Sequence, residues 1–146
     1  MPVRRSGVEK ANPGSDGTTT SKASRGSPPN AAGSASLGIF DAEGGDLLGS
    51  IGFRTEHFAR VEFGYWTRAD RRGRGIVPRA LRLVSRWAVE ELGAKRLQLH
   101  ADVANLASQR AAEKAGFTRE GVRRSYIEID GERRDVVGFS LLPDEL

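Results

Sequence analysis

Residues 68–75 concentrate side chains and glycines that can bind anionic oxygen atoms. The segment reads RADRRGRG, and further arginines follow in the next dozen positions: Arg79, Arg82 and Arg86. Because glycine lacks a Cβ, Gly73 and Gly75 let the backbone approach a bound group closely. A helical spacing of apolar residues begins at Ile76, so the loop leads into a helix N-terminus, where unpaired N–H groups and the helix dipole attract anions. The segment therefore predicts a pyrophosphate site.

Three phosphate-binding patterns compete for this loop. The nucleoside-triphosphate loop needs a Lys directly after its last glycine, and Ile76 stands there. The dinucleotide pattern needs a third glycine where this chain has Pro78. The third pattern, Gln/Arg-x-x-Gly-x-Gly/Ala, fits from Arg72 to Gly75 and departs at Val77, where a small residue is expected. A Gly/Arg-rich surface turn is the alternative to all three.

A second motif lies downstream, on a predicted helix. Asn105 is followed eleven residues later by Gly116 and Phe117, with Ser108 between them. Together with the loop and with residues 62–66 (EFGYW), it resembles the GNAT superfamily of acyl-CoA-dependent N-acyltransferases. Within that superfamily the chain is most similar to the ribosomal-protein N-terminal acetyltransferase branch, and the resemblance covers about residues 47–142.

The resemblance implies that acetyl-CoA is the acyl donor. Its pantetheine arm would lie between two separating strands, at residues 61–67 and 96–101. The loop backbone would hold the pyrophosphate, and a backbone N–H near Tyr65 or Trp66 would polarise the thioester carbonyl. The residues implied to bind acetyl-CoA are Tyr65, Trp66, Arg72, Gly73, Arg74, Gly75, Ile76, Val77 and Asn105.

The implied reaction is acetyl transfer to a primary amine, with a protein N-terminal α-amine as one possible acceptor. Many GNAT members place a Tyr seven residues after the Asn, and that position is Ala112 here. The branch therefore implies Ser108 as the proton donor to the leaving thiolate. The alternative for Ser108 is a helical serine bonded back to a carbonyl of its own helix.

Glu62 is the candidate general base, because it is the one acidic residue inside an otherwise apolar strand. The alternative is an ordinary strand charge that faces solvent. His57 and His100 are weaker candidates, since a loop histidine and a strand histidine are more often incidental. Tyr126, on a later strand, could also reach the cleft, but spacing does not decide this.

The elements that would position these residues follow from periodicity and turn signals. Strands are predicted at residues 37–40, 47–53, 61–67, 96–101, 126–129 and 135–139, and helices at 76–92 and 105–115. Asp130 and Gly131 predict a two-residue turn between the last two strands, within a long hairpin that extends from Phe117 to Leu142. The order is β-β-β-α-β-α-β-β, an α/β (α+β) fold. By resemblance its sheet is mixed, mostly antiparallel and flanked by helices.

Residues 1–36 differ in composition from the rest of the chain. They are rich in Gly, Pro, Ser and Thr, and all ten aromatic residues lie after them. Such a segment buries too little apolar surface to offset the entropy of ordering, which predicts a disordered tail before a single acyl-CoA-binding domain at residues 37–146. GNAT domains normally begin with a strand and two helices that form one wall of the acceptor site. No such pattern precedes Leu37, so a non-catalytic acyl-CoA-binding module with an incomplete acceptor site is the alternative function.

Composition limits the remaining possibilities. The chain has 146 residues, a net charge of +4, no cysteine and two histidines, so no metal site is expected. No apolar run is long enough to span a membrane and no export signal is recognisable, which predicts a cytoplasmic protein. No aromatic residue alternates with the clustered arginines, so nucleic acid is not expected as a partner. The acceptor and the oligomeric state stay open.

Overall fold

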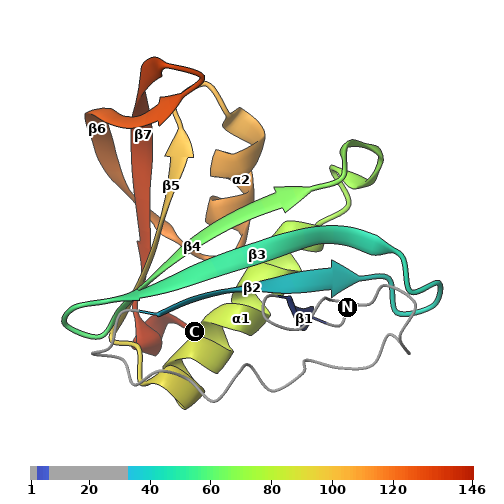
Figure 1. Cartoon of the computed structure of the whole chain (residues 1–146). Helices are drawn as coiled ribbons and strands as arrows, with labels where there is room; N and C mark the ends of the chain where they lie inside the picture. The colour runs from blue at the N-terminus through green and yellow to red at the C-terminus, as the bar shows by residue number, and fades with distance from the viewer. Residues whose placement is uncertain (1–2, 7–32) are drawn as a thin grey trace.

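Seven strands form one sheet in the order β1-β2-β3-β4-β5-β7-β6 in the computed structural model, which describes residues 3–6 and 33–146 (Figure 1). The strands are β1 (Val3–Ser6), β2 (Gly33–Phe40), β3 (Leu47–Glu56), β4 (Arg60–Thr67), β5 (Arg96–Asp102), β6 (Thr118–Ile129) and β7 (Glu132–Leu141). The α-helices are α1 (Ile76–Leu92) and α2 (Leu106–Lys114), and short 3-10 turns occupy Ala69–Arg71 and Pro143–Glu145. The predicted element order is confirmed from β2 onwards.

β4 and β5 form the one parallel pair among the described strands, and they part after a short run. Their register extends from Arg60 opposite Arg96 to Phe63 opposite Leu99. Beyond that point β4 pairs only with β3, and β5 pairs only with β7. The arrows of β4 and β5 diverge accordingly in Figure 1. The predicted separation of these two strands is confirmed, and it leaves strand backbone without a neighbour on the inner side of the fork.

Both helices share one hydrophobic core with the sheet. The amphipathic helix α1 buries Leu81, Val84 and Ala88, while α2 contributes Ala112. α1 ends at Gly93, whose left-handed backbone (φ 66°) suits glycine. Central strand residues such as Leu97 and Phe139 are fully buried beneath the helices. This packing holds the N-terminal ends of α1 and α2 beside the fork.

The N-terminal part of the chain differs from the prediction. Val3–Ser6 forms β1, which pairs antiparallel with β2, and β2 begins at Gly33 rather than at Leu37. The edge of β2 is therefore paired, although the sequence predicted no strand before Leu37. Edge pairing uses backbone groups, so it does not need the apolar side chains that the prediction looked for. The predicted disorder of residues 7–32, and the absence of helices there, lie outside the described residues.

The β6–β7 hairpin occupies the stretch predicted for it, residues 117–142, although its strands extend beyond the two short runs that the sequence marked as strands. Asp130 (φ 51°) and Gly131 (φ 80°) form the expected turn. β6, however, already begins at Thr118, and its pairing with β7 is interrupted twice, between Arg119 and Gly121 and between Arg123 and Ile127. Most β6 side chains are exposed, so neither alternation nor an apolar run marks the first part of the strand.

Candidate active site

A cavity of about 380 Å³ lies where β4 separates from β5, between the loop after β4 and the first turns of α1 and α2. Eight of the nine residues predicted to bind the donor line it: Tyr65, Trp66, Arg72, Gly73, Gly75, Ile76, Val77 and Asn105. Ser108 lines it as well. Arg74 is not among the lining residues; its carbonyl accepts a hydrogen bond from Arg79. Strand, loop and both helices thus meet at one hollow.

The loop backbone is shaped for close approach by an anion. Gly73 (φ 78°) and Gly75 (φ 69°) both adopt left-handed conformations, and a Cβ on either would meet no atom within 4 Å. Gly75 is the N-cap of α1 and has no side chain to bond to the first turn. The N–H groups of Ile76 and Val77 therefore lack helical partners, as first-turn groups do, while Pro78 has no N–H to satisfy. Open space and unpaired donors are what a phosphate needs.

Basic side chains surround the same hollow. Besides Arg72, the cavity is lined by Arg71, Arg110 and Lys114. Arg71 is partly offset by Asp46 and Asp70, at 3.8 and 3.9 Å. Arg110 and Lys114 were not predicted from the sequence. Their spacing of four residues places them on one face of α2. This spacing is the feature of the sequence from which they could have been predicted. These basic side chains and the N–H groups at the start of α1 together fit a ligand that carries several phosphates.

Val77 forms part of the cavity wall. Its side chain is 8% exposed, and it lies outside the main hydrophobic cluster to which Ile76 belongs. The loop pattern expected a small residue at this position. In this chain the larger side chain narrows the cavity next to the first turn of α1.

Ser108 makes contacts that the sequence did not reveal. Its Oγ donates to the Tyr65 hydroxyl at 3.0 Å, and that hydroxyl donates to the Ser108 carbonyl at 2.8 Å. The Ser108 N–H donates to Asn105 Oδ1, which caps α2. Burial raises the pKa of Tyr65, although its hydrogen bond with Ser108 acts in the opposite direction. Two hydroxyls from β4 and α2 therefore lie together on the cavity wall, and rotation of the Ser108 hydroxyl away from Tyr65 would let it donate to a nearby anion.

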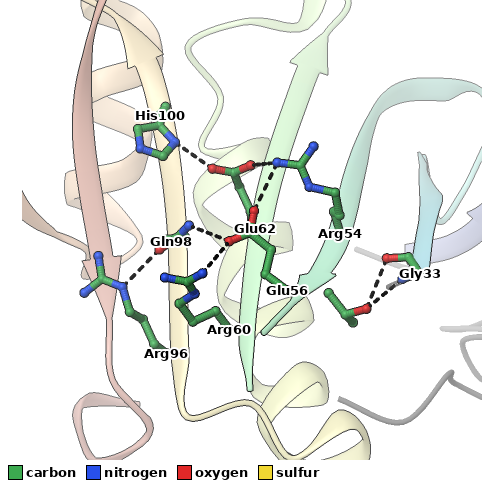
Figure 2. Close-up of polar contacts among 9 residues, drawn as sticks. Gly33, Arg54, Glu56, Arg60, Glu62, Arg96, Gln98 and His100 are labelled. Carbon is green, nitrogen blue, oxygen red and sulfur yellow. Dashed lines mark hydrogen bonds and ion pairs between the residues drawn. The ribbon is translucent and has the colours of Figure 1, made fainter. Parts of the chain in front are cut away.

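Glu62 lies outside this cavity, in a polar network across β3, β4 and β5 (Figure 2). One carboxylate oxygen is 2.7 Å from His100 Nδ1, and the other is 2.5 Å from Arg54. The hydrogen bond from His100 lowers the pKa of Glu62. Burial acts to raise this pKa, and the positive charge of Arg54 lowers it further. With a side chain that is only 17% exposed, Glu62 is not an ordinary solvent-facing strand charge.

The two histidines have different surroundings. His57 is exposed in the turn between β3 and β4, with its ring tilted against Phe58. His100 is 12% exposed, and its ring centroid lies 4.7 Å from that of Tyr126. The structure thus joins Glu62, His100 and Tyr126, which the sequence considered separately.

Comparison with known proteins identifies the family to which this chain belongs. The model of the acetyltransferase (GNAT) domain matches residues 8–118. The chain belongs to the GNAT acetyltransferase family. Its sheet, with a fork between β4 and β5 above a glycine loop and a helix N-terminus, is the framework that the motifs led us to expect.

Two curated relatives and one solved structure show how far the similarity extends. The chain is 36% identical over 86 residues to YdaF of Bacillus subtilis, which is named as a proposed ribosomal N-acetyltransferase. The match covers 59% of this chain and 47% of YdaF. It is 33% identical over 113 residues to YjcK of the same organism, which is named as a proposed N-acetyltransferase. This match covers 75% of this chain and 62% of YjcK. Mycobacterium smegmatis RimJ, solved with CoA disulfide, shares the fold with a TM-score of 0.70 at 23% identity, over 77% of this chain and 55% of RimJ.

The GNAT chain thus spans about half to three fifths of the length of these two curated relatives. Neither described α-helix is long and apolar enough to cross a bilayer. Within residues 3–6 and 33–146, no three metal-ligating side chains lie together as a metal site would require.

Proposed function

We propose that this GNAT domain transfers the acetyl group of acetyl-CoA to a primary amine by direct attack. The observation that carries the proposal is the cavity at the fork, which combines unpaired helix N–H groups, several cations and the Ser108–Tyr65 hydroxyl pair. The names of YdaF and YjcK and the CoA disulfide bound to RimJ support it. The cytoplasmic location stays a prediction.

In this proposal the donor lies along the fork. Its pyrophosphate is held by the N–H groups of Ile76 and Val77, with Arg72 and Lys114 neutralising charge from either side. The pantetheine arm follows the inner side of β4 beyond Phe63, where the strand has no β5 partner. A backbone N–H near Tyr65 then donates to the thioester oxygen and stabilises the charge that develops there.

The chemistry needs two proton transfers. The amine nitrogen attacks the acetyl carbon, so a C–N bond forms, the C–S bond breaks and one N–H proton leaves. The thiolate of CoA departs and takes a proton from the hydroxyl of Ser108, which Tyr65 orients and which regains its proton from solvent. The amine proton leaves through the polar network that contains Glu62 and His100. The products are an acetylated amine and the free thiol of CoA.

We further propose a protein or peptide α-amine as the acceptor, supported by the name of YdaF and by the motifs of the N-terminal acetyltransferase branch. An acceptor of this kind reaches the reacting carbon from the end of the fork, beside Trp66, which is about half exposed. A flat aromatic surface next to the reaction centre suits a backbone of variable sequence.

A thermal-shift panel followed by an acceptor assay tests the proposal. We expect CoA and acetyl-CoA to raise the melting temperature, since saturation at about 100 times Kd adds about 2.7 kcal/mol. Release of CoA thiol should then require an amine acceptor. The three to be tried are trialanine amide, a peptide whose α-amine is acetylated and whose lysine side chain is free, and spermidine. Binding without release for all three would leave an acyl-CoA-binding module and refute the transferase, and no thermal shift would refute donor binding.

A further inference from the structure

A Glu–His pair lies where β4 and β5 separate. Leu99 is the last β5 residue paired with β4, so His100 is the first residue beyond the pairing. Its Nδ1 lies 2.7 Å from Glu62 Oε1, on the neighbouring strand (Figure 2). The pair thus sits at the base of the fork along which the donor is proposed to lie.

The carboxylate of Glu62 is poorly suited to accept the amine proton itself. One oxygen is engaged by His100 and the other by Arg54, at 2.7 and 2.5 Å. These partners stabilise the ionised form and hold the pKa of Glu62 below its ordinary value. A carboxylate with a lowered pKa is a weak base near neutral pH, where general-base catalysis works best with a group that titrates near the working pH.

The imidazole of His100 is oriented to act in its place. Since Nδ1 faces a carboxylate, we assign the neutral ring proton to Nδ1, and the lone pair to Nε2. Within the described part of the chain, no hydrogen bond or ion pair involves Nε2. On β7, Gly138 lies opposite His100, and a Cβ there would come within 3.8 Å of Nε2. Because residue 138 is glycine, β7 places no side chain against this edge of the ring.

β6 supplies a cover for the ring. The Tyr126 ring lies 4.7 Å from the His100 ring, centroid to centroid, and the Arg123 guanidinium lies over Tyr126 at 5.5 Å. A break in the β6–β7 register turns the strand here. It is fixed by Ser125 (φ 50°), whose N–H donates to Asp135 at 2.7 Å and whose carbonyl accepts from Arg133. The charged or titratable groups that face His100 from β3, β4 and β6 are thus Arg54 (through Glu62), Glu62, Tyr126 and Arg123.

We propose that His100 Nε2 accepts the proton from the attacking amine, and that Glu62 is a positioning residue that orients the ring and stabilises the imidazolium. The inference rests on the proposed acetyl transfer. As the C–N bond forms, the N–H bond of the amine breaks and its proton passes to Nε2. After the C–S bond has broken, the imidazolium returns the proton to solvent while the thiolate is protonated beside Ser108.

The test is a set of pH profiles of kcat/KM with one acceptor, trialanine amide. We expect His100→Gln, which can still bond to Glu62, to lower kcat about 100-fold or more without changing the Kd for acetyl-CoA. Glu62→Gln should keep part of the rate and leave the Kd for acetyl-CoA unchanged, because it removes the carboxylate that orients the ring. His57→Gln, the matched histidine control in an exposed turn, should behave as the wild type.

Two results would overturn the assignment. One is a wild-type rate in His100→Gln together with loss of activity at every pH in Glu62→Gln, which would make Glu62 the base. The other comes from imidazole nitrogen NMR of the wild type, which needs no turnover. We expect the Nδ1–H form of neutral His100, and an Nε2–H form would exclude the proposed acceptor atom. Failure of the wild type to acetylate any amine would instead refute the proposed function.

Discussion

Single side chains at this site take their roles from partners on other elements. In the sequence of α2, Ser108 is a serine three residues after an N-cap asparagine, and a hydroxyl bonded back to its own helix was the alternative to a role in catalysis. In the fold, its hydroxyl bonds to Tyr65 on β4. That contact joins residues 43 positions apart, and helical spacing contains no information about it.

Replacing Ser108 with Ala should lower kcat about 10- to 100-fold, because the leaving thiolate loses a hydrogen-bond donor. The Kd for acetyl-CoA, measured by calorimetry, should stay within about twofold, since the phosphate site is untouched. Ala107→Ser, which adds a hydroxyl at the neighbouring cavity position, is the matched control. An unchanged kcat in Ser108→Ala would remove this residue from the proposed chemistry.

Glu62 should also make stability depend on pH. Its pKa is lowered in the folded state from an ordinary value of 4.5, chiefly by the hydrogen bond from His100. The stabilisation is therefore present above the ordinary pKa and is lost as pH falls through the lower, folded value. Urea unfolding at about pH 6 and about pH 3 should show a smaller loss for Glu62→Gln than for the wild type.

Glu128→Gln, which changes an exposed carboxylate on β6, is the control and should keep the wild-type loss. If Glu62→Gln and the wild type lose the same free energy of unfolding on acidification, the carboxylate of Glu62 is not stabilised as the geometry indicates.

Among the elements, the glycine loop and α1 were the most predictable. A polar glycine loop followed by a 3.6-residue period specifies a loop and helix whatever surrounds them, and Ile76–Leu92 matches the expected helix. The cations of α2 were missed because their use depends on where α2 lies beside α1. The pairing of Glu62 with His100 was missed for a similar reason, since it depends on the register of β4 against β5.

Gly75 offers a matched pair of variants for the loop. Gly75→Asn and Gly75→Asp have nearly the same shape, tolerate a positive φ better than other side chains, and each costs roughly 1–2 kcal/mol of stability. Only Asp places a negative charge at the start of α1. We expect its Kd for acetyl-CoA to be at least about 10-fold weaker than that of Asn, a difference of about 1.4 kcal/mol. Equal affinities by calorimetry would show that no phosphate lies at this helix end.

For the whole molecule, the sequence predicted one domain from Leu37 onwards with the observed element order. The strand at the edge of the sheet, β1, and the first residues of β2 were not predicted. β1 is four residues long, and β2 starts with the small residues 33–36, so neither produces an apolar pattern. The first half of β6 lay inside the predicted hairpin, but the sequence did not mark it as a strand because both of its faces are largely exposed. Prediction failed where backbone pairing, rather than burial of side chains, determines the strand.

Removing residues 1–6 tests the contribution of β1. The edge of β2 would lose the pairing that runs from Val3 opposite Ile39 to Ser6 opposite Ser36. We expect a melting temperature lower by several degrees and self-association through the freed edge, measured by calorimetry and analytical ultracentrifugation. An unchanged melting temperature and a monomer would return residues 3–6 to the predicted disordered tail.

The most direct test of the central claim is transfer of a labelled acetyl group, followed by mass spectrometry. The chain is incubated with acetyl-CoA labelled with carbon-13 in the acetyl group and with trialanine amide. We predict that the peptide gains the labelled acetyl group on its α-amine, mole for mole with released CoA thiol, and that Gly75→Asp reduces the gain when acetyl-CoA is below its Kd. Full binding of acetyl-CoA with no labelled product on this peptide, on a lysine side chain or on spermidine would contradict the account.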